Sequence, residues 1–193
     1  MSDLDTTFPF LPLPDGIFIS SVRTAPTELV VHIACRRSCA PCALCQQQSE
    51  RVHGTYGRTV ADLPCGGCRV ILALTVRKFV CSVPTCPRKI FTERLPELVQ
   101  SYARMTNRLR EALVALGLAT SAEVSQRVAP SLGMKVSAPT LPRRLGAVAC
   151  PPPASVRILG VDDWSWKKGQ TYGTLLVDLE LRKSIELLAV KRD

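Results

Sequence analysis

Three closely spaced cysteine pairs constrain the fold of this chain more than any other feature of its sequence. They are Cys42 and Cys45 (C-x2-C), Cys65 and Cys68 (C-x2-C), and Cys81 and Cys86 (C-x4-C). Two thiolates a few residues apart on a tight turn can bind one ion, and two such pairs complete a tetrahedral structural zinc site. The chain has nine cysteines, an odd number, and its N-terminus lacks the features of an export signal. Metal binding is therefore a better interpretation than a disulfide framework.

The sequence around the pairs indicates which four cysteines share the metal. Cys65 and Cys68 enclose two glycines, which is typical of a hairpin turn, and the second strand of that hairpin would run to Cys81. In a zinc ribbon the second ligand pair follows such a strand. The predicted ligands are Cys42, Cys45, Cys81 and Cys86. The spacing of Cys42 and Cys45 with Cys65 and Cys68 also fits a zinc site, and this quartet is the alternative.

The positive charge of the chain is concentrated in its middle. The formal net charge is +9, and residues 51–144 hold fifteen basic and five acidic side chains. Such a segment fits a surface that faces a polyanion, most commonly nucleic acid. The expected phosphate contacts are Arg51, Arg58, Arg77, Lys78, Arg104, Arg108, Arg143 and Arg144. No apolar stretch approaches the roughly 20 residues of a membrane span, so we expect no membrane partner.

The pattern becomes helical from Pro96. Apolar residues recur at three-and-four spacing up to Gly117, which predicts an amphipathic helix over residues 96–117. Two short helices are expected next, one capped by Ser121 and one running from Ser137 to Gly146. Together they predict a helix-turn-helix, whose second helix would place Ser137, Thr140 and Arg143 against DNA bases. Pro142 would interrupt this second helix unless the helix begins later than Ser137.

After a proline-rich linker that follows Cys150, the period of the pattern becomes two. An apolar strand from Arg157 to Val161 ends in Asp162 and Asp163, and KKGQ predicts a turn. A second strand over residues 172–179 and a third from Ser184 complete an antiparallel meander. An acidic residue at the end of an apolar strand suits a magnesium ligand in nucleases, and a turn-capping aspartate pair is the alternative.

Four blocks of sequence together resemble bacterial insertion-sequence transposases of the ISL-three family. They are the first C-x2-C pair, the segment SERVHGTYGRTVADLP (residues 49–64), the segment from Val76 to Pro96 that contains Cys81 and Cys86, and LGVDDWSWKKGQTYGTLLVDLE (residues 159–180). The last block is the most specific, whereas the helix-turn-helix agrees only loosely. The resemblance covers nearly the whole chain.

The resemblance implies an N-terminal zinc ribbon, a helix-turn-helix that binds the element's terminal inverted repeats in double-stranded DNA, and the start of an RNase H-like DDE domain. In the family pattern the first catalytic acid falls on Asp162. It would share magnesium with two acids far beyond residue 193, so we expect a truncated transposase that is inactive alone. Cys65, Cys68 and Pro142 depart from the family pattern.

We therefore expect an α+β, multi-module chain. The predicted modules are an extension with one strand (1–34), a zinc ribbon (35–95), a helix-turn-helix domain (96–149) and the first strands of the catalytic domain (150–193). A cytoplasmic, nucleoid-associated protein that forms homo-oligomers would fit this function. The alternatives are a zinc-ribbon and helix-turn-helix transcriptional regulator, or a thiol or metal sensor that uses the surplus cysteines.

Overall fold

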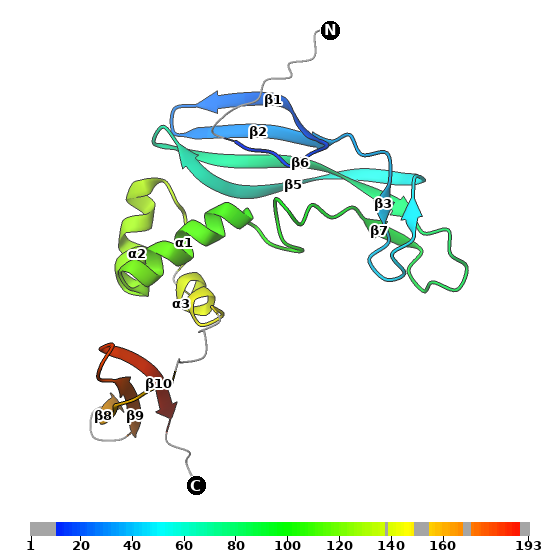
Figure 1. Ribbon diagram of the computed structural model, residues 1–193. Coiled ribbons are helices and arrows are strands. Elements are labelled where there is room, and N and C mark those ends of the chain that lie inside the picture. Colours follow the sequence, from blue (N-terminus) through cyan, green and yellow to red (C-terminus); the bar gives the residue numbers. More distant parts are fainter. Residues whose placement is uncertain (1–10, 138, 149–154, 168–170, 190–193) are drawn as a thin grey trace. The chain divides into compact units, whose positions relative to one another are not determined.

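The computed structural model describes residues 11–137, 139–148, 155–167 and 171–189 (Figure 1). The chain divides into two compact units, residues 1–147 and residues 148–193. Cys150, the proline-rich linker after it and the expected turn at residues 168–170 lie outside the described residues. The described chain is mixed α and β, as expected, with strands as its main elements.

A five-stranded sheet forms the larger part of the first unit. Its strands are β1 (Ile17–Ala25), β2 (Glu28–Cys35), β5 (Val52–Cys65), β6 (Cys68–Val80) and β7 (Ile90–Thr92). The order is β1-β2-β6-β5, and β7 also pairs with β6. Strands β2 and β6 are parallel, while the other pairs are antiparallel.

The first 34 residues contain two strands where the sequence predicted one. β1 pairs with β2 along its length, and β2 (ELVVHIAC) is the strand that the apolar alternation of the sequence predicts. β1 is an edge strand and most of its residues are exposed, so it lacks the apolar alternation that reveals a half-buried strand. Both strands belong to the same sheet as the long hairpin that follows, rather than to a separate extension.

The predicted hairpin is confirmed. β5 and β6 pair from Val52 with Phe79 down to Cys65 with Cys68, and Gly66 and Gly67 form the turn with φ of 57° and 78°. Both values are left-handed, which favours glycine and matches the twist of a two-residue hairpin turn.

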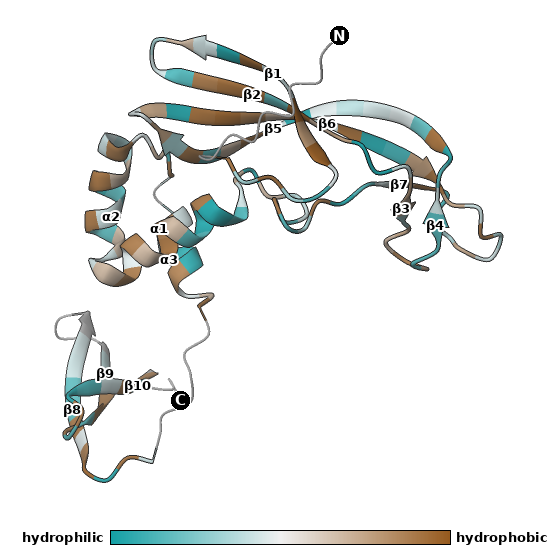
Figure 2. Cartoon of the chain, turned by 45° about the horizontal axis from the view of Figure 1, so that its top comes forward, coloured by the Kyte–Doolittle hydropathy of each residue, from teal (hydrophilic) through white to brown (hydrophobic). Residues whose placement is uncertain are grey.

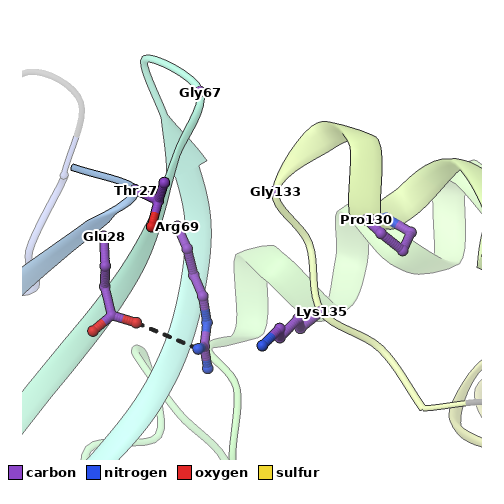
Figure 3. A pocket seen from close by; sticks show the side chains of 7 residues that line it. All are labelled: Thr27, Glu28, Gly67, Arg69, Pro130, Gly133 and Lys135. Carbon is purple, nitrogen blue, oxygen red and sulfur yellow. Dashed lines mark hydrogen bonds and ion pairs between the residues drawn. The ribbon is translucent and has the colours of Figure 1, made fainter. Parts of the chain in front are cut away.

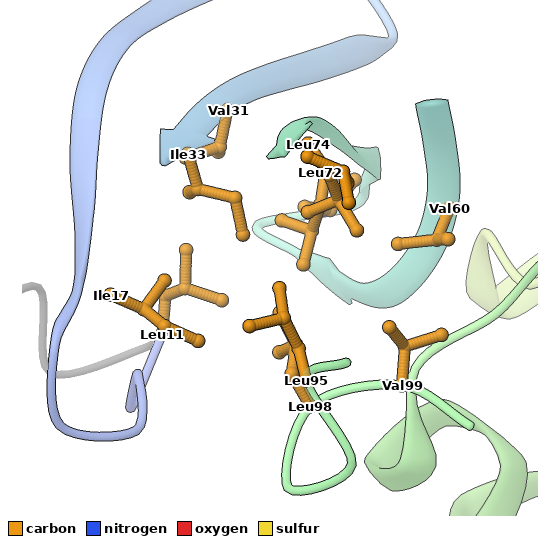
Figure 4. Packing of buried hydrophobic residues seen from close by; sticks show 12 residues of the cluster. Leu11, Ile17, Val31, Ile33, Val60, Leu72, Leu74, Leu95, Leu98 and Val99 are labelled. Atoms are coloured by element: carbon orange, nitrogen blue, oxygen red, sulfur yellow. The ribbon is translucent and has the colours of Figure 1, made fainter. Parts of the chain in front are cut away.

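The main core lies between one face of this sheet and the segment that follows β7 (Figure 4). Alternate residues of β6 point into it, because successive side chains of a strand face opposite sides. Figure 2 shows the apolar character of these inner strands. The buried residues are Leu11, Ile17, Val31, Ile33, Val60, Val70, Leu72, Leu74, Val76, Leu95, Leu98 and Val99.

The first predicted helix begins eleven residues later than expected. Helix α1 spans Asn107–Ala119, and Thr106 caps it by accepting a hydrogen bond from the backbone N–H of Leu109. The residues before it are not helical, since Leu98 and Val99 pack on the sheet. Tyr102 lies within the range of the predicted helix and is one of the residues of its apolar spacing, but its side chain is 83% exposed.

Two further helices complete a small helical module in the first unit. Helix α2 (Ala122–Val128) is capped by Ser121 as predicted, and a 3-10 turn over Ala129–Leu132 follows it. Helix α3 spans only Thr140–Leu145, and Ser137 does not cap it. Because α3 begins at Thr140, Pro142 lies in its first turn, where a missing N–H breaks no helical hydrogen bond. Their shared core consists of Leu109, Leu113, Ala129, Met134 and Leu141.

The second unit is the predicted antiparallel meander. Its strands are β8 (Leu159–Lys167), β9 (Thr171–Asp178) and β10 (Lys183–Ala189), in the order β10-β9-β8. The first strand was expected to end at Val161, but β8 continues beyond it, and Asp162 pairs with Leu175 within the strand. Apolar side chains of this unit are exposed, among them Val161 at 64% and Leu181 at 61%.

Candidate metal centre and basic surfaces

Four of the cysteines meet at one end of the long hairpin. Cys42 and Cys45 lie on the loop between β3 (Ala40–Pro41) and β4 (Gln48–Ser49), two short strands that pair with each other. Cys81 directly follows β6, and Cys86 precedes β7. The pairing of β6 with β7 therefore brings the second cysteine loop beside the first.

The sulfur atoms of these cysteines have the spacing of a tetrahedral metal site. The four Sγ atoms all lie within 4.8 Å of one another. Cys42 Sγ is 4.0 Å from Cys86 Sγ, and Cys45 Sγ is 3.6 Å from Cys81 Sγ. A zinc ion at about 2.3 Å from each thiolate places tetrahedral sulfurs about 3.8 Å apart. The residues present therefore fit a structural zinc ion.

Backbone hydrogen bonds shape both cysteine loops. Cys42 donates its N–H to the carbonyl of Gln47 at 2.9 Å, and Gln46 donates to the carbonyl of Cys42 at 2.9 Å. In the second loop Cys81 donates to the carbonyl of Lys89 at 2.8 Å, and Cys86 donates to the carbonyl of Val83 at 3.1 Å. These bonds fix each loop as a tight turn whose two sulfurs face the same point.

A small apolar cluster supports the cysteines. The rings of Phe79 and Phe91 stack with their centroids 5.8 Å apart, beside the buried thiols of Cys42, Cys81 and Cys86. Cys45 is exposed. This cluster is too small to fold alone, and a metal would replace the missing part of its core.

The loop geometry perturbs two of the thiols in opposite directions. The backbone N–H groups of Cys45 and Leu44 point at Cys42 and lower its pKa to about 6. At Cys81 the N–H of Val83 acts in the same direction, but burial and the thiols of Cys45, Cys86 and Cys42 outweigh it and raise the pKa to about 12. Without a metal, one thiol of the cluster loses its proton readily, and the resulting negative charge disfavours ionisation of the next thiol.

The alternative quartet does not come together. Cys65 and Cys68 pair at the glycine turn, whereas Cys81 follows the opposite end of β6. That strand has 13 residues and spans roughly 40 Å at 3.3 Å per residue. Cys65 and Cys68 are therefore too far from Cys42 and Cys45 to bind the same ion.

A shallow hollow of about 380 Å³ lies near this glycine turn (Figure 3). Arg69 forms an ion pair with Glu28 at 3.3 Å, and the side chain of Lys135 extends toward the Arg69 guanidinium. The remaining lining residues are Thr27, Gly67, Pro130 and Gly133.

Several predicted DNA contacts have other partners in the structure. Arg108 binds the carboxylate of Asp62 with two of its nitrogens, and the Asp62 side chain is fully buried. Arg77 binds Glu93 in the same bidentate manner, at 2.7 Å for the shorter ion-pair distance. Arg58 donates to the carbonyl of Ala103. These guanidiniums hold the fold together, because Arg108 and Arg77 each neutralise a buried carboxylate and Arg58 satisfies a backbone carbonyl.

The predicted base contacts are only partly at the surface. Thr140 is 9% exposed, and its hydroxyl lies 2.6 Å from that of Ser137. The Thr140 hydroxyl therefore already has a hydrogen-bond partner inside the helical module, because α3 begins at Thr140 instead of at Ser137. Ser137, Arg104 and Arg143 are exposed.

A cluster of three arginines on α1 and α3 contains Arg110, which is not among the predicted DNA contacts. The pKa of Arg144 is lowered by burial and then by the charges of Arg110 and Arg143. The Nε of Arg144 is buried without a hydrogen-bond partner among the described residues. Arg110 contacts Glu111 at 3.8 Å. The sequence places Arg110 on the basic face of the predicted helix but does not join it to Arg144, because the two are 34 residues apart and only the packing of α1 on α3 brings them together.

The predicted catalytic acid, Asp162, stands on the edge strand β8 and is exposed. In the described part of the chain, no group of three metal-ligating side chains with clustered ligand atoms includes it. Asp178, at the end of β9, accepts hydrogen bonds from the N–H groups of Glu180 and Leu181 and so caps a turn. These residues do not by themselves form a magnesium site.

Comparisons with known proteins agree with this site. Residues 38–88 match the family described as zinc-finger of transposase IS204/IS1001/IS1096/IS1165, and all four clustered cysteines lie in this range. The chain is 30% identical over 137 residues to the transposase for insertion sequence element IS1001 of Bordetella parapertussis. The match covers 71% of this chain and 33% of that protein, so the chain spans about a third of its relative's length. No solved structure matches.

These findings confirm the resemblance stated from the sequence, and together with the four clustered cysteines they support a structural zinc ion. None of the helices that the structure describes has the length and apolar character needed to cross a membrane.

Proposed function

We propose that this chain, a relative of the ISL-three insertion-sequence transposases, is a DNA-binding part of such a transposase. Cys42, Cys45, Cys81 and Cys86 bind a structural zinc ion, which fixes the two cysteine loops at the end of the long hairpin. The helical module contacts the terminal inverted repeats of the element in double-stranded DNA. Because it binds DNA in this proposal, the chain is associated with the nucleoid.

The observation that carries DNA binding is the arginine cluster of Arg110, Arg143 and Arg144. Like charges held together are unfavourable unless an anion lies between them. The buried Nε of Arg144 has no hydrogen-bond partner among the described residues, so the cluster still has an N–H group without an acceptor. A DNA phosphate supplies the charge and the acceptors that the cluster lacks, and guanidinium groups bind phosphate with two donors at once.

The experiment is duplex binding by the zinc-loaded chain, with DNA ends of the parent element and fluorescence anisotropy as the readout. Arg143→Ala and Arg144→Ala should each weaken binding and reduce the slope of log affinity against log salt by about 1. Arg23→Ala, on the exposed part of β1, removes the same charge and is the control. An equal loss for Arg23→Ala, or affinity that does not change with salt, would refute the proposal.

For Asp162 we propose the role of first acid in the catalytic site of the complete transposase. This role rests on the match of the G-V-D-D block to the family pattern. Partner acids would have to come from outside the described residues, so this chain alone should not cleave DNA when magnesium is added. Asp162→Asn should leave duplex affinity unchanged. Magnesium-dependent nicking by the purified chain, lost in Asp162→Asn, would overturn the expectation of inactivity.

A further inference from the structure

Two tyrosines and two cations form a surface that the proposed duplex contact does not use. Lys78 Nζ lies 5.4 Å from the ring centroid of Tyr56, and the guanidinium carbon of Arg94 lies 5.1 Å from that of Tyr102. Tyr56 is 36% exposed and Tyr102 is 83% exposed. These four residues are called the aromatic-basic surface below.

The four residues come from three different segments, and two of them, Tyr56 and Arg94, line one hollow. Tyr56 lies on β5, Lys78 on β6, and Arg94 and Tyr102 on the segment after β7. The lining of the hollow includes Tyr56, Arg94 and Ser101, the residue directly before Tyr102. Its other lining residues are Arg58, Leu74, Val76, Thr92, Glu93, Leu95, Val99 and Gln100.

The charge around the hollow is positive and not neutralised. Its acid, Glu93, is bound to Arg77, and neither Lys78 nor Arg94 forms an ion pair with another described residue. The hydrogen bond from Arg94, followed by the charges of Arg94 and Arg88, lowers the pKa of Tyr102. An anionic ligand would therefore be favoured here.

The backbone at Tyr102 suggests that the exposed ring has a use. Its φ is 63°, in the left-handed region, which is unusual for a residue with a bulky side chain. The ring does not gain burial in return, since most of its surface faces solvent. A flat ring held at the surface beside a cation is the arrangement with which proteins bind unpaired nucleotides, because the ring stacks on a base and the cation binds the phosphate.

We infer that the aromatic-basic surface binds single-stranded DNA, with bases stacked on Tyr102 and Tyr56 and phosphates bound by Arg94 and Lys78. Duplex DNA does not fit this chemistry, because its bases are stacked on one another and unavailable to the rings. The inference goes beyond the duplex contact of the helical module, from which it is independent.

The test measures binding of a labelled twelve-nucleotide oligothymidine by the zinc-loaded full chain. Tyr102→Ala should weaken binding at least about 5-fold, since one base–aromatic stack contributes at least that factor, and Tyr102→Phe should keep the affinity. Tyr172→Ala is the matched control, because Tyr172 is 54% exposed on the other unit. Zinc content and circular dichroism confirm that each variant is folded.

A second arm separates stacking from charge alone. An oligonucleotide of equal length with abasic sites keeps the phosphates and should bind more weakly, with no further loss on Tyr102→Ala. Unchanged oligothymidine affinity in Tyr102→Ala, or equal binding of both oligonucleotides, would overturn the inference. Arg143→Ala should weaken only duplex binding and Tyr102→Ala only single-strand binding, so failure of one proposal is distinguishable from failure of the other.

Discussion

Asp62 links the sheet to the helical module through the side chains of Thr106 and Arg108. Its carboxylate, on β5, accepts a hydrogen bond from the Thr106 hydroxyl at 2.7 Å and binds the guanidinium of Arg108. Thr106 in turn caps α1, so the negative charge lies near the N-terminus of that helix, where it is favourable. A residue that resembled a DNA contact in the sequence is therefore an anchor of the fold.

Removing Arg108 should destabilise the protein rather than change its DNA specificity. Arg108→Ala leaves a fully buried carboxylate without its charge partner, and the expected loss is about 3 kcal/mol in the free energy of unfolding. Denaturant titration measures this loss. Arg104→Ala, an exposed neighbour, should cost less than about 0.5 kcal/mol. Similar losses in the two variants would contradict the anchoring role.

Single cysteine substitutions decide the zinc ligands. Cys42→Ser should release zinc, because it removes one of the four thiolates that lie within 4.8 Å of one another. Cys65→Ser, at the far end of the hairpin, should retain one zinc per chain. Metal analysis by mass spectrometry after exhaustive dialysis is the measurement. Retained zinc in Cys42→Ser would refute the proposed quartet.

The pKa of Cys42 gives a pH dependence for the metal-free chain. Its folded value of about 6 lies below the ordinary value of 9.0, so this thiolate contributes stability that is fully present above pH 9 and is lost as the pH falls through about 6. Thiolate ultraviolet absorbance should show a step near pH 6 that Cys42→Ser lacks. A zinc-free chain with no such step would show that the loop N–H groups do not stabilise the thiolate.

At the level of elements, the β5–β6 hairpin organises the sheet of the first unit. One end carries the cysteine loops and the other the glycine turn, and β2, β7 and the segment after β7 pack along its length. The turn requires two left-handed residues in succession. Its glycines therefore contribute to the register of both strands.

Gly67→Ala tests this requirement against a matched glycine. An added Cβ would meet nothing within 4 Å at either Gly67 or Gly57, and only Gly67 has a positive φ, of 78°. Gly67→Ala should lower the free energy of unfolding by about 1 kcal/mol, since an L-residue is strained in this region. Gly57→Ala, within β5, should not destabilise the protein. Equal stabilities measured by denaturant titration would show that the turn can change its conformation.

On the scale of the whole molecule, the two units differ in how they are stabilised. The first has three buried clusters and the proposed zinc. The described residues of the second contribute to none of these clusters and leave large apolar side chains exposed, including Leu187 and Leu188. An uncovered sheet face of this kind promotes aggregation and proteolysis.

Limited proteolysis should therefore cut the second unit first. With zinc bound, residues 11–147 should persist as a resistant fragment while residues 155–189 are degraded, and a chelator should extend cleavage into the cysteine loops. Mass spectrometry of the fragments identifies the cuts. Persistence of the second unit would indicate a stability that its exposed apolar residues do not explain.

The sequence by itself determined the local features: the cysteine pairs, the glycine turn, the Ser121 cap and the meander of the second unit. Each of these features depends on residues that are close together in the chain, and their spacing in the sequence determines the local backbone geometry. The resemblance to the transposase family likewise rested on fixed spacings of residues.

Only the tertiary structure decided which cysteines meet: the pairing of β6 with β7 brings the Cys81–Cys86 loop to the cluster, and the length of β6 keeps Cys65 and Cys68 away from it. The tertiary structure also decided which arginines form ion pairs with buried carboxylates and where α1 begins. It further showed that an exposed edge strand precedes β2. These outcomes depend on packing between residues far apart in sequence, where tertiary burial outweighs local periodicity. Burial of Leu98 and Val99 against the sheet, for example, is more favourable than their inclusion in a longer helix.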